Sequence, residues 1–258
     1  MEFIKKEEKE GVGIITLNRP EVYNSFNIPM ALEVQATLDE YEKDDSIRAI
    51  ILTAEGKGFC AGQDLKEATG ENAPSIETIV DTTYNPIVMR LRNIEKPIIG
   101  VINGVAAGAG ANIAIACDIT FASEKASFIQ SFSSIGLIPD SGGTFFLPRL
   151  IGMQRATAHM FLADKFTAQK AKEIGMIYEV VEHEKLQETA FEFAKLLAQR
   201  PTKGFGLTKR ALNKALTNDL ETQLTVERDL QAQAAKTDDN KEGIEAFLEK
   251  RKPVFKGK

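Results

Sequence analysis

Residues 98–117 read IIGVINGVAAGAGANIAIAC, a β-branched run joined by small residues to an apolar stretch. The β-branched run is typical of a buried strand, and the small residues at 103–112 allow close approach of the backbone. The apolar stretch at 113–117 predicts a helix, whose first N–H groups and dipole favour negative charge. This order predicts an α/β fold with functional loops at strand ends.

On both sides of this stretch, short apolar runs alternate with helical patterns. The pattern predicts strands at residues 13–17, 49–53, 98–102 and 119–122, and helices at 28–44 and 76–93. After about Arg149 it becomes almost wholly helical, at 155–162, 186–199, 204–216, 220–236 and 241–250, with one strand at 177–181. We therefore expect a core over residues 1–200 that carries the site, and a C-terminal helical oligomerisation region over residues 201–258. The apolar residues of the late helices predict oligomer contacts or, equally, docking onto the chain's own core.

The bulk composition excludes several classes of protein. The 258 residues are 43% hydrophobic and 27% charged, which suits a folded domain, and the net charge of -5 argues against a nucleic-acid partner. No apolar run approaches the ~18 residues of a membrane span, and the charged N-terminus does not resemble a signal peptide. Cys60 and Cys117 lack partners at metal-ligand spacing, so we expect no metal and a cytoplasmic location.

A second loop rich in small residues, GKGFCAGQDL at residues 56–65, follows the strand at 49–53. Such a loop can aim a main-chain N–H outward, and two donors near two strand ends are what an oxyanion hole requires. Either loop alone is also consistent with a plain turn. A dinucleotide fingerprint is excluded for the 103–112 loop, because Gly108 and Gly110 are followed by Ile113 at the third glycine position.

A third segment, SFSSIGLIPDSGGTFFLPRLIG at residues 131–152, places Asp140 between a proline and a glycine pair. One interpretation is a helix N-cap, because Asp is a good capping residue. The other is a catalytic base. The apolar side chains around Asp140 would desolvate its carboxylate and so strengthen it as a base.

The segments LNRPEVYNSF, GFCAGQDL, NGVAAGAGAN, IGLIPDSGGT and EGIEAFLEKRKPVFKGK together resemble the crotonase (enoyl-CoA hydratase/isomerase) family in order and spacing. The resemblance runs from about Phe3 to the C-terminus. It implies a spiral of ββα turns with a C-terminal helical trimerisation region, assembled as a homotrimer or a dimer of trimers. It also implies an acyl-CoA thioester substrate, so that coenzyme A is part of the substrate and no separate cofactor is needed.

The resemblance also implies roles for individual residues. The backbone N–H groups of Gln63 and Ala109 match the family's two donors to the thioester oxygen, and Asp140 is the expected base. The two glutamates with which hydratases activate water are replaced here by Asn112 and Phe132. The pattern is therefore similar to the isomerases of the family, which convert 1,2-epoxyphenylacetyl-CoA to oxepin-CoA or move a double bond from C3 to C2.

Further contacts are expected from the same resemblance. The coenzyme A moiety is expected to contact Val22, Tyr23, Ala61, Asp64, Leu65 and Lys66, with Phe247 and Lys250 from the last helix or a neighbouring subunit. The acyl pocket is expected to include Phe132, Ile138 and Phe145. The family's usual lysine two residues before Tyr23 is Glu21 here, so neutralisation of the phosphates must come from elsewhere.

Three other functions remain as alternatives. The first is an enoyl-CoA hydratase. The second is an aryl-CoA dehalogenase with Asp140 as nucleophile, which the absence of tryptophan disfavours. The third is a non-catalytic acyl-CoA or RNA-binding relative, against which the retained Asp140 and the acidic composition argue.

Overall fold

Two sheets form the centre of the computed structural model, which describes residues 2–69 and 71–258. The larger sheet has the order β1-β2-β3-β5-β7-β10, and the smaller one the order β4-β6-β8-β9. The larger sheet consists of β1 (Ile4–Lys9), β2 (Val12–Leu17), β3 (Ala49–Ala54), β5 (Ile98–Ile102), β7 (Ile119–Ser123) and β10 (Glu179–Val181). The smaller one consists of β4 (Gly58–Cys60), β6 (Val105–Ala107), β8 (Ser127–Ile129) and β9 (Lys165–Thr167). Among the described strands, β1 and β9, each at one edge of its sheet, pair antiparallel to their neighbours, and the other pairs are parallel.

The chain passes from the larger to the smaller sheet three times, through β3–β4, β5–β6 and β7–β8, and a helical segment follows each pair. After β4 come α2 (Leu65–Ala68), α3 (Ile76–Ile79), the π-turn η2 (Val80–Tyr84) and α4 (Asn85–Asn93). After β6 comes α5 (Ala109–Ala116), and after β8 come η3 (Ser131–Ile135), α6 (Gly143–Ile151) and α7 (Met153–Leu162). The predicted spiral of ββα turns is thus confirmed.

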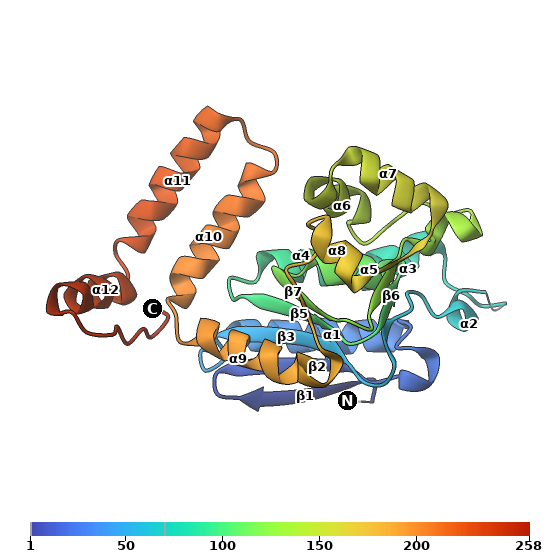
Figure 1. Cartoon of the computed structure of the whole chain (residues 1–258), viewed down its shortest axis with the longest axis horizontal. Helices are drawn as coiled ribbons and strands as arrows, with labels where there is room; N and C mark the ends of the chain where they lie inside the picture. Colours follow the sequence, from blue (N-terminus) through green and yellow to red (C-terminus); the bar gives the residue numbers. More distant parts are fainter. Residues whose placement is uncertain (1, 70) are drawn as a thin grey trace.

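Helices cover both faces of the larger sheet (Figure 1). On one face lie α1 (Ile28–Lys43), α4 and α5, which share the main apolar core with the strands. On the other lies α9 (Leu186–Ala198), whose alanines pack against residues of β2, β3, β5 and β7. Every residue of β3 and β5 is buried, as expected for parallel strands covered on both faces.

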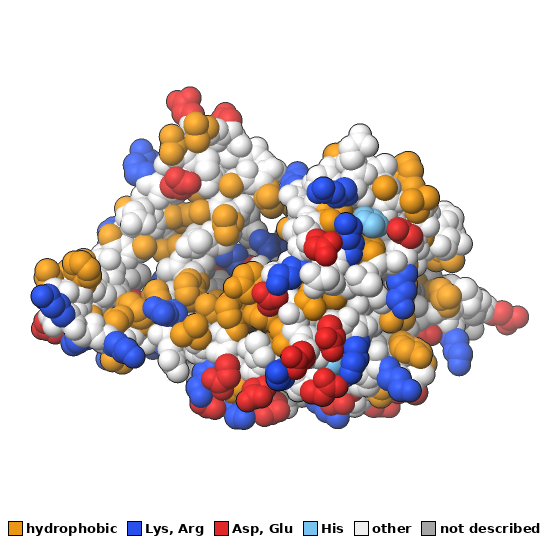
Figure 2. Space-filling model, in the orientation of Figure 1, with side chains coloured by type: hydrophobic (Ala, Val, Ile, Leu, Met, Phe, Trp, Pro, Cys, Tyr) orange, Lys and Arg blue, Asp and Glu red, His pale blue; other side chains and the backbone are white. Residues whose placement is uncertain are grey.

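The last three helices, α10 (Thr202–Ala215), α11 (Leu220–Ala234) and α12 (Asp238–Glu249), form an arm beside the core (Figure 1). The buried Lys209 of α10 joins the arm to the core through a 2.7 Å ion pair with Asp118. Hydrophobic side chains gather along the arm in Figure 2, and the exposed ones include Leu220, Leu224, Ile244 and Phe247. Docking of these four onto the chain's own core, one of the two alternatives, is therefore wrong, whereas Leu230, the fifth residue behind that prediction, is buried. The division between residues 200 and 201 stays a prediction.

The sequence pattern missed several elements and shifted others. The predicted helix over residues 76–93 is interrupted by the π-turn, and the helix expected at 113–117 begins at Ala109. The prediction omitted β1, β4, β6, β8 and β9, and the short elements α2, η3, η1 (Pro20–Val22), α8 (Ala168–Glu173) and η4 (His183–Lys185). Within residues 2–69 and 71–258, no helix has the length and apolar character needed to cross a bilayer.

Candidate active site

The loop after β4 turns the main-chain N–H of Gln63 away from Phe26, the residue with which the loop pairs. Phe26 pairs with this loop on both sides of Gln63, donating to the Gly62 carbonyl at 2.7 Å and accepting from the Asp64 N–H at 2.8 Å. Because successive residues of an extended segment point to opposite edges, the N–H of Gln63 lies on the other edge. Gly62 has φ of +94°, a conformation that a residue with a side chain rarely adopts.

The loop after β6 presents a second amide at the start of α5. Gly108 precedes the helix with φ of 53° and ψ of -125°. Ala109 is the first helical residue, so the helix contains no carbonyl one turn earlier that its N–H could bind. A main-chain donor at a helix N-terminus is well suited to hold a developing negative charge.

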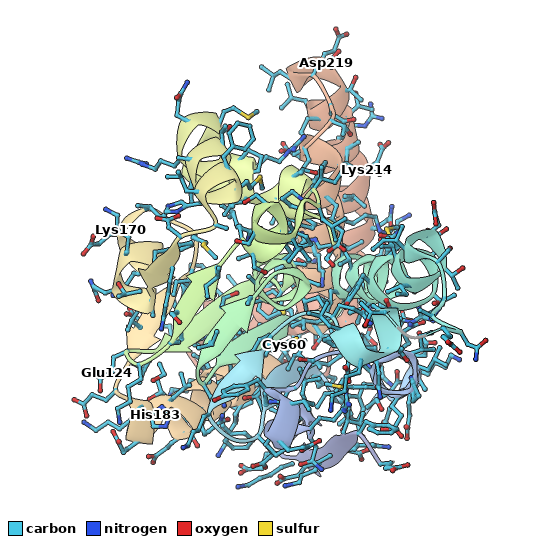
Figure 3. All side chains as sticks on the ribbon, turned by 90° about the vertical axis from the view of Figure 1, so that its right-hand side faces the viewer. Cys60, Glu124, Lys170, His183, Lys214 and Asp219 are labelled. Carbon is cyan, nitrogen blue, oxygen red and sulfur yellow. The ribbon has the colours of Figure 1, made fainter. Side chains whose placement is uncertain are left out.

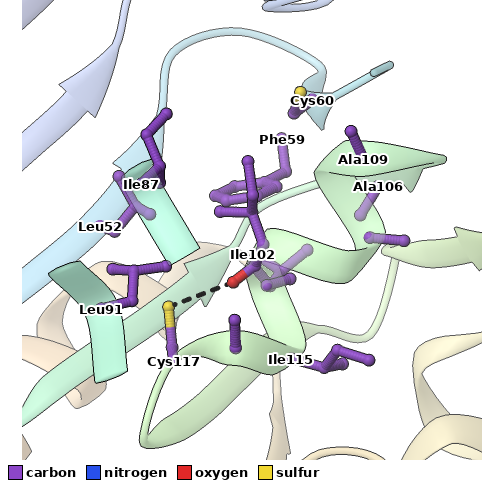
Figure 4. Packing of buried hydrophobic residues seen from close by; sticks show 14 of the residues in the cluster. Leu52, Phe59, Cys60, Ile87, Leu91, Ile102, Ala106, Ala109, Ile115 and Cys117 are labelled. Carbon is purple, nitrogen blue, oxygen red and sulfur yellow. Dashed lines mark hydrogen bonds between the residues drawn. The ribbon is translucent and has the colours of Figure 1, made fainter. Parts of the chain in front are cut away.

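These two loops contact each other directly. A Cβ placed on Gly62 would lie 3.7 Å from the Ala109 nitrogen, and one on Gly110 would lie only 2.5 Å from the Cys60 carbonyl oxygen. Glycine is therefore required at position 110 for α5 to pack on the end of β4. Figure 4 shows Cys60 and Ala109 close together at the edge of the core, and Figure 3 labels the buried Cys60 near the middle of its view.

Asp140 lies in the turn before α6 and is fixed there through its main chain. Its carbonyl oxygen accepts hydrogen bonds from Asn112 Nδ2 at 2.9 Å and from the Gly143 N–H at 2.8 Å. Its carboxylate accepts one from Ser141 Oγ at 2.8 Å. The residue at the N-cap position of α6 is Gly142, so the interpretation of Asp140 as a helix cap is wrong.

Burial raises the pKa of the Asp140 carboxyl, and the hydrogen bond from Ser141 opposes that rise only in part. The rise follows from desolvation, which disfavours the charged form. A carboxylate with a raised pKa binds a proton more strongly, so it is a better acceptor for a proton taken from carbon.

Asn112 and Phe132, which the resemblance matches to the two hydratase acids, pack against neighbouring segments. Asn112 is fully buried and accepts a 2.8 Å hydrogen bond from Gln130 Nε2 through its side-chain oxygen. A Cβ on Gly143 would lie 2.3 Å from Asn112 Nδ2, so α5 and α6 are in close contact here. The ring of Phe132 is 7% exposed and lies beside Gly108, next to the second amide.

The other two expected pocket residues differ in their surroundings. Phe145 is half-buried, with the Arg149 guanidinium 3.8 Å from its ring centroid. Ile138 is 81% exposed in this chain, although it precedes Asp140 by only two residues. A role in the pocket stays a prediction for both.

The segments expected to bind coenzyme A are joined to each other. The N–H of Ala61 donates to the Tyr23 carbonyl at 3.0 Å, and Asp64 forms a 2.8 Å ion pair with Arg19. Sequence reasoning missed Asn24, whose buried Nδ2 donates to the carbonyls of Glu55 and Gly58, each at 2.9 Å. Ala61, Leu65 and Lys66 are exposed and Val22 is half-buried.

Phe247 and Lys250 lie far from these segments within the chain. Figure 1 places α12 and α2 at opposite ends of the longest axis of the molecule. Phe247 is on α12 and 82% exposed, and Lys250 caps the same helix. The expectation that the chain's own last helix reaches the site is therefore wrong. Supply of Phe247 and Lys250 by a neighbouring subunit stays a prediction.

Sequence reasoning also missed two residues that hold the Gln63 side chain, Tyr84 and Glu67. Tyr84 falls inside a helical pattern and Glu67 in a charged turn, so neither belonged to a recognisable motif. The irregular turn that carries Tyr84 gave no signal in the apolar periodicity.

Comparison with known proteins identifies the family. Residues 7–258 match the enoyl-CoA hydratase/isomerase family. The chain belongs to the enoyl-CoA hydratase/isomerase family. Among its relatives, the chain is 48% identical to 1,2-epoxyphenylacetyl-CoA isomerase of Escherichia coli (strain K12), over 100% of both sequences. It is 38% identical to trans-2-decenoyl-[acyl-carrier-protein] isomerase of Streptococcus mutans serotype c, over 96% of this chain and 95% of that protein.

The solved structures agree with this assignment. The enoyl-CoA hydratase of Bacillus anthracis superposes with a TM-score of 0.95 and 35% identity, and 100% of both chains is covered. The chain is thus an enzyme of the enoyl-CoA hydratase/isomerase family. Relatives named as isomerases and relatives named as hydratases both lie within it.

Proposed function

We propose that this chain is an acyl-CoA isomerase that acts on 1,2-epoxyphenylacetyl-CoA, a 3-enoyl-CoA, or both. The observation that carries the proposal is the arrangement around Asp140. Asn112 stands where the resemblance expects a hydratase acid, and its amide instead anchors the Asp140 turn. An amide cannot act as a general base toward water at neutral pH, so one acid is left to carry out the proton transfers.

The mechanism follows from the charge that develops on the thioester. A proton on the carbon next to the carbonyl becomes acidic only when the enolate oxygen is stabilised. The N–H groups of Gln63 and Ala109 would supply two hydrogen bonds to that oxygen. For a 3-enoyl substrate, Asp140 would take a proton from C2 and return it to C4, which moves the double bond to C2. For the ring epoxide, the same groups would assist ring opening and expansion.

The aromatic side chains near Asp140 would help to select the substrate. Phe132 is buried beside Gly108, and Phe145 lies in the first turn of α6, five residues after Asp140. Apolar rings near the reacting carbon would exclude water and contact an aromatic ring or an alkyl chain. Exclusion of water also favours proton return over hydration.

Coenzyme A is proposed to bind across the loops at Val22 and Tyr23 and at Ala61 and Asp64 to Lys66. Because α12 lies at the far end of the chain, Phe247 and Lys250 would be supplied by another copy in a homotrimer or a dimer of trimers. The exposed apolar side chains of α11 and α12 are suited to such an assembly. No additional cofactor is required for a proton shuttle of this kind.

A turnover screen tests the proposal. The protein is incubated separately with 1,2-epoxyphenylacetyl-CoA, a 3-enoyl-CoA and a 2-enoyl-CoA, and the products are separated by chromatography. We expect isomerised product from at least one of the first two and little hydration of the third. Dominant hydration of the 2-enoyl-CoA would instead assign the chain as a hydratase.

A further inference from the structure

We propose that Tyr84 is a positioning residue for the thioester-binding amide of Gln63 and acts through the Gln63 side chain. Tyr84 Oη donates a 2.7 Å hydrogen bond to Gln63 Oε1. Gln63 Nε2 donates at 3.1 Å to Glu67 Oε2. The carboxamide is thus held from both ends. This inference rests on the proposed function, because it takes the Gln63 N–H as a donor to the thioester oxygen.

The chemistry of the two partners fixes the orientation of the carboxamide. The Glu67 carboxylate can only accept, and its two oxygens also accept from the Ile28 N–H at 3.1 Å each. Burial first, and then nearby negative charge that includes Asp140, raises the pKa of the Tyr84 phenol well above its ordinary value. Tyr84 therefore stays protonated and donates. The side-chain oxygen of Gln63 must face Tyr84 and its nitrogen Glu67.

A fixed side chain adds to the restraint that Phe26 places on the backbone around Gln63. Gly62 lacks a side chain and has φ of +94°, and its carbonyl, in the same peptide as the Gln63 N–H, accepts a 2.7 Å hydrogen bond from the Phe26 N–H. Phe26 holds this loop along one edge only. Fixing the carboxamide restrains the Cα of Gln63 and hence the direction of its N–H. A donor that is aimed in advance needs no reorganisation during the reaction.

Tyr84 is itself held by an unusual local structure. It ends the π-turn Val80–Tyr84, a feature frequent at functional sites. Gln35 of α1 donates from Nε2 to the Thr82 carbonyl of this turn at 2.9 Å. The Tyr84 ring also meets Phe26 edge to face, with 5.9 Å between the ring centroids. The same phenylalanine therefore contacts both the backbone of the Gln63 loop and the ring of Tyr84.

Tyr41 provides a matched control for the hydroxyl of Tyr84. It is another fully buried tyrosine, and its Oη donates to the main-chain carbonyl of Glu7 at 2.9 Å, away from the two loops. Removing either hydroxyl deletes one buried hydrogen bond. Only the loss at Tyr84 is expected to change the thioester site.

The test compares the parent protein with Tyr84→Phe, Gln63→Met, the double variant and Tyr41→Phe. Each is saturated with a 3-aryl-2-enoyl-CoA thioester, whose absorption moves to longer wavelength when donors polarise its carbonyl. In parallel, kcat and KM are measured with the thioester that the parent protein isomerises. Gln63→Met removes the side-chain hydrogen bonds to Tyr84 and Glu67, and a longer one of 3.4 Å to the Asp64 carbonyl, and keeps the main-chain N–H.

We expect Tyr84→Phe and Gln63→Met each to reduce the red shift and to lower kcat by about tenfold, or about 1.4 kcal/mol. We expect KM to change by less than about twofold, because the loss is in the transition state. The double variant should be no worse than Gln63→Met alone, since the hydrogen bond between Tyr84 and Gln63 is already lost in that variant. Tyr41→Phe should lower only the melting temperature.

A Tyr84→Phe protein with the parent's red shift and kcat would overturn the inference. If that variant does not fold, Gln63→Met decides the matter by the same two measurements. A parent protein that shifts the probe but isomerises no thioester would refute the proposed function and leave the positioning role in place. A parent that isomerises its substrate, with both variants equal to it in red shift and kcat, would refute the positioning role and leave the proposed function in place.

Discussion

The side-chain nitrogen of Asn112 lies 2.9 Å from the main-chain oxygen of Asp140, to which it donates a hydrogen bond. A residue of α5 thereby sets the position of a turn that precedes α6. Because α5 also begins with Ala109, one helix positions both a proposed oxyanion donor and the proposed base. Movement of this helix would disturb both groups together.

Replacing Asp140 by Asn should abolish most turnover. General-base catalysis contributes about 10²–10⁴-fold, and we expect kcat to fall by that order while coenzyme A binding changes little. Steady-state kinetics with the thioester that the parent isomerises measures kcat. Calorimetric titration with coenzyme A measures its binding. Turnover at the parent rate would show that another group removes the proton.

The same substitution should stabilise the folded protein at neutral pH. The pKa of Asp140 is raised in the folded state from its ordinary value of 3.8. The charged carboxylate therefore lowers the free energy of unfolding at pH values above 3.8, and the loss is largest above the pKa of the folded state. Asn lacks this cost. Melting temperatures of the parent and Asp140→Asn should therefore differ at pH 7 and converge as the pH falls to about 4. An equal gap at all pH values would contradict the desolvation argument.

Removal of the Ser141 hydroxyl should shift the pH profile. Its hydrogen bond to the carboxylate lowers the pKa of Asp140 against the effect of burial. In Ser141→Ala the pKa of Asp140 should rise, and the acid limb of kcat/KM should move to higher pH, because the base must be deprotonated. A profile measured over the acidic range tests this, and an unmoved limb would mean that another group sets it.

Introducing a glutamate at position 112 should not create a hydratase. Asn112 is fully buried, and the Gly143 backbone leaves no room for a longer side chain beside it. We expect Asn112→Glu to destabilise the fold by about 1–3 kcal/mol, since a buried polar group loses its partners. Thermal unfolding measures the loss of stability, and an assay with a 2-enoyl-CoA tests for hydration. Efficient hydration by a stable variant would show that the pocket adapts.

Adding one methyl group at Gly110 should separate the two loops of the site. An Ala side chain there would lie 2.5 Å from the Cys60 carbonyl oxygen, so α5 must move away from β4. The control is Gly204→Ala, also within a helix, whose nearest neighbour would be at 3.7 Å. We expect Gly110→Ala to lose the red shift of the bound thioester, and Gly204→Ala to keep it and gain up to about 1 kcal/mol of stability. Similar behaviour of the two variants would contradict the close packing.

The sequence predicted the parts of the fold that depend on local pattern. The runs at residues 49–53 and 98–102 are buried parallel strands, and the helix expected at 204–216 is observed at Thr202–Ala215. The short strands β4 and β6 were missed, because a strand of three residues beside glycines is too short to show periodicity. Strand β1 was missed because five of its six residues are exposed and charged.

The candidate site was predictable where backbone geometry leaves a composition signal. The glycines around Gln63 and Ala109 indicated two outward amides, and the geometry of both loops is consistent with that prediction. The contacts that fix these groups join segments distant along the chain, such as Asn112 with Asp140 and Tyr84 with Gln63. Such contacts depend on how helices pack, which the pattern of one segment does not contain.

The π-turn at Val80–Tyr84 makes the spacing of this segment as important as its composition. The N–H of Asn85 binds the carbonyl of Val80, five residues back, so the turn accommodates one residue more than an α-helix would. Deleting one residue there would rotate everything on one side of it by about 100° relative to the other. Tyr84 and α3 could then no longer both keep their present neighbours. Most side-chain exchanges in residues 80–83 should therefore be tolerated far better than a deletion or insertion of one residue.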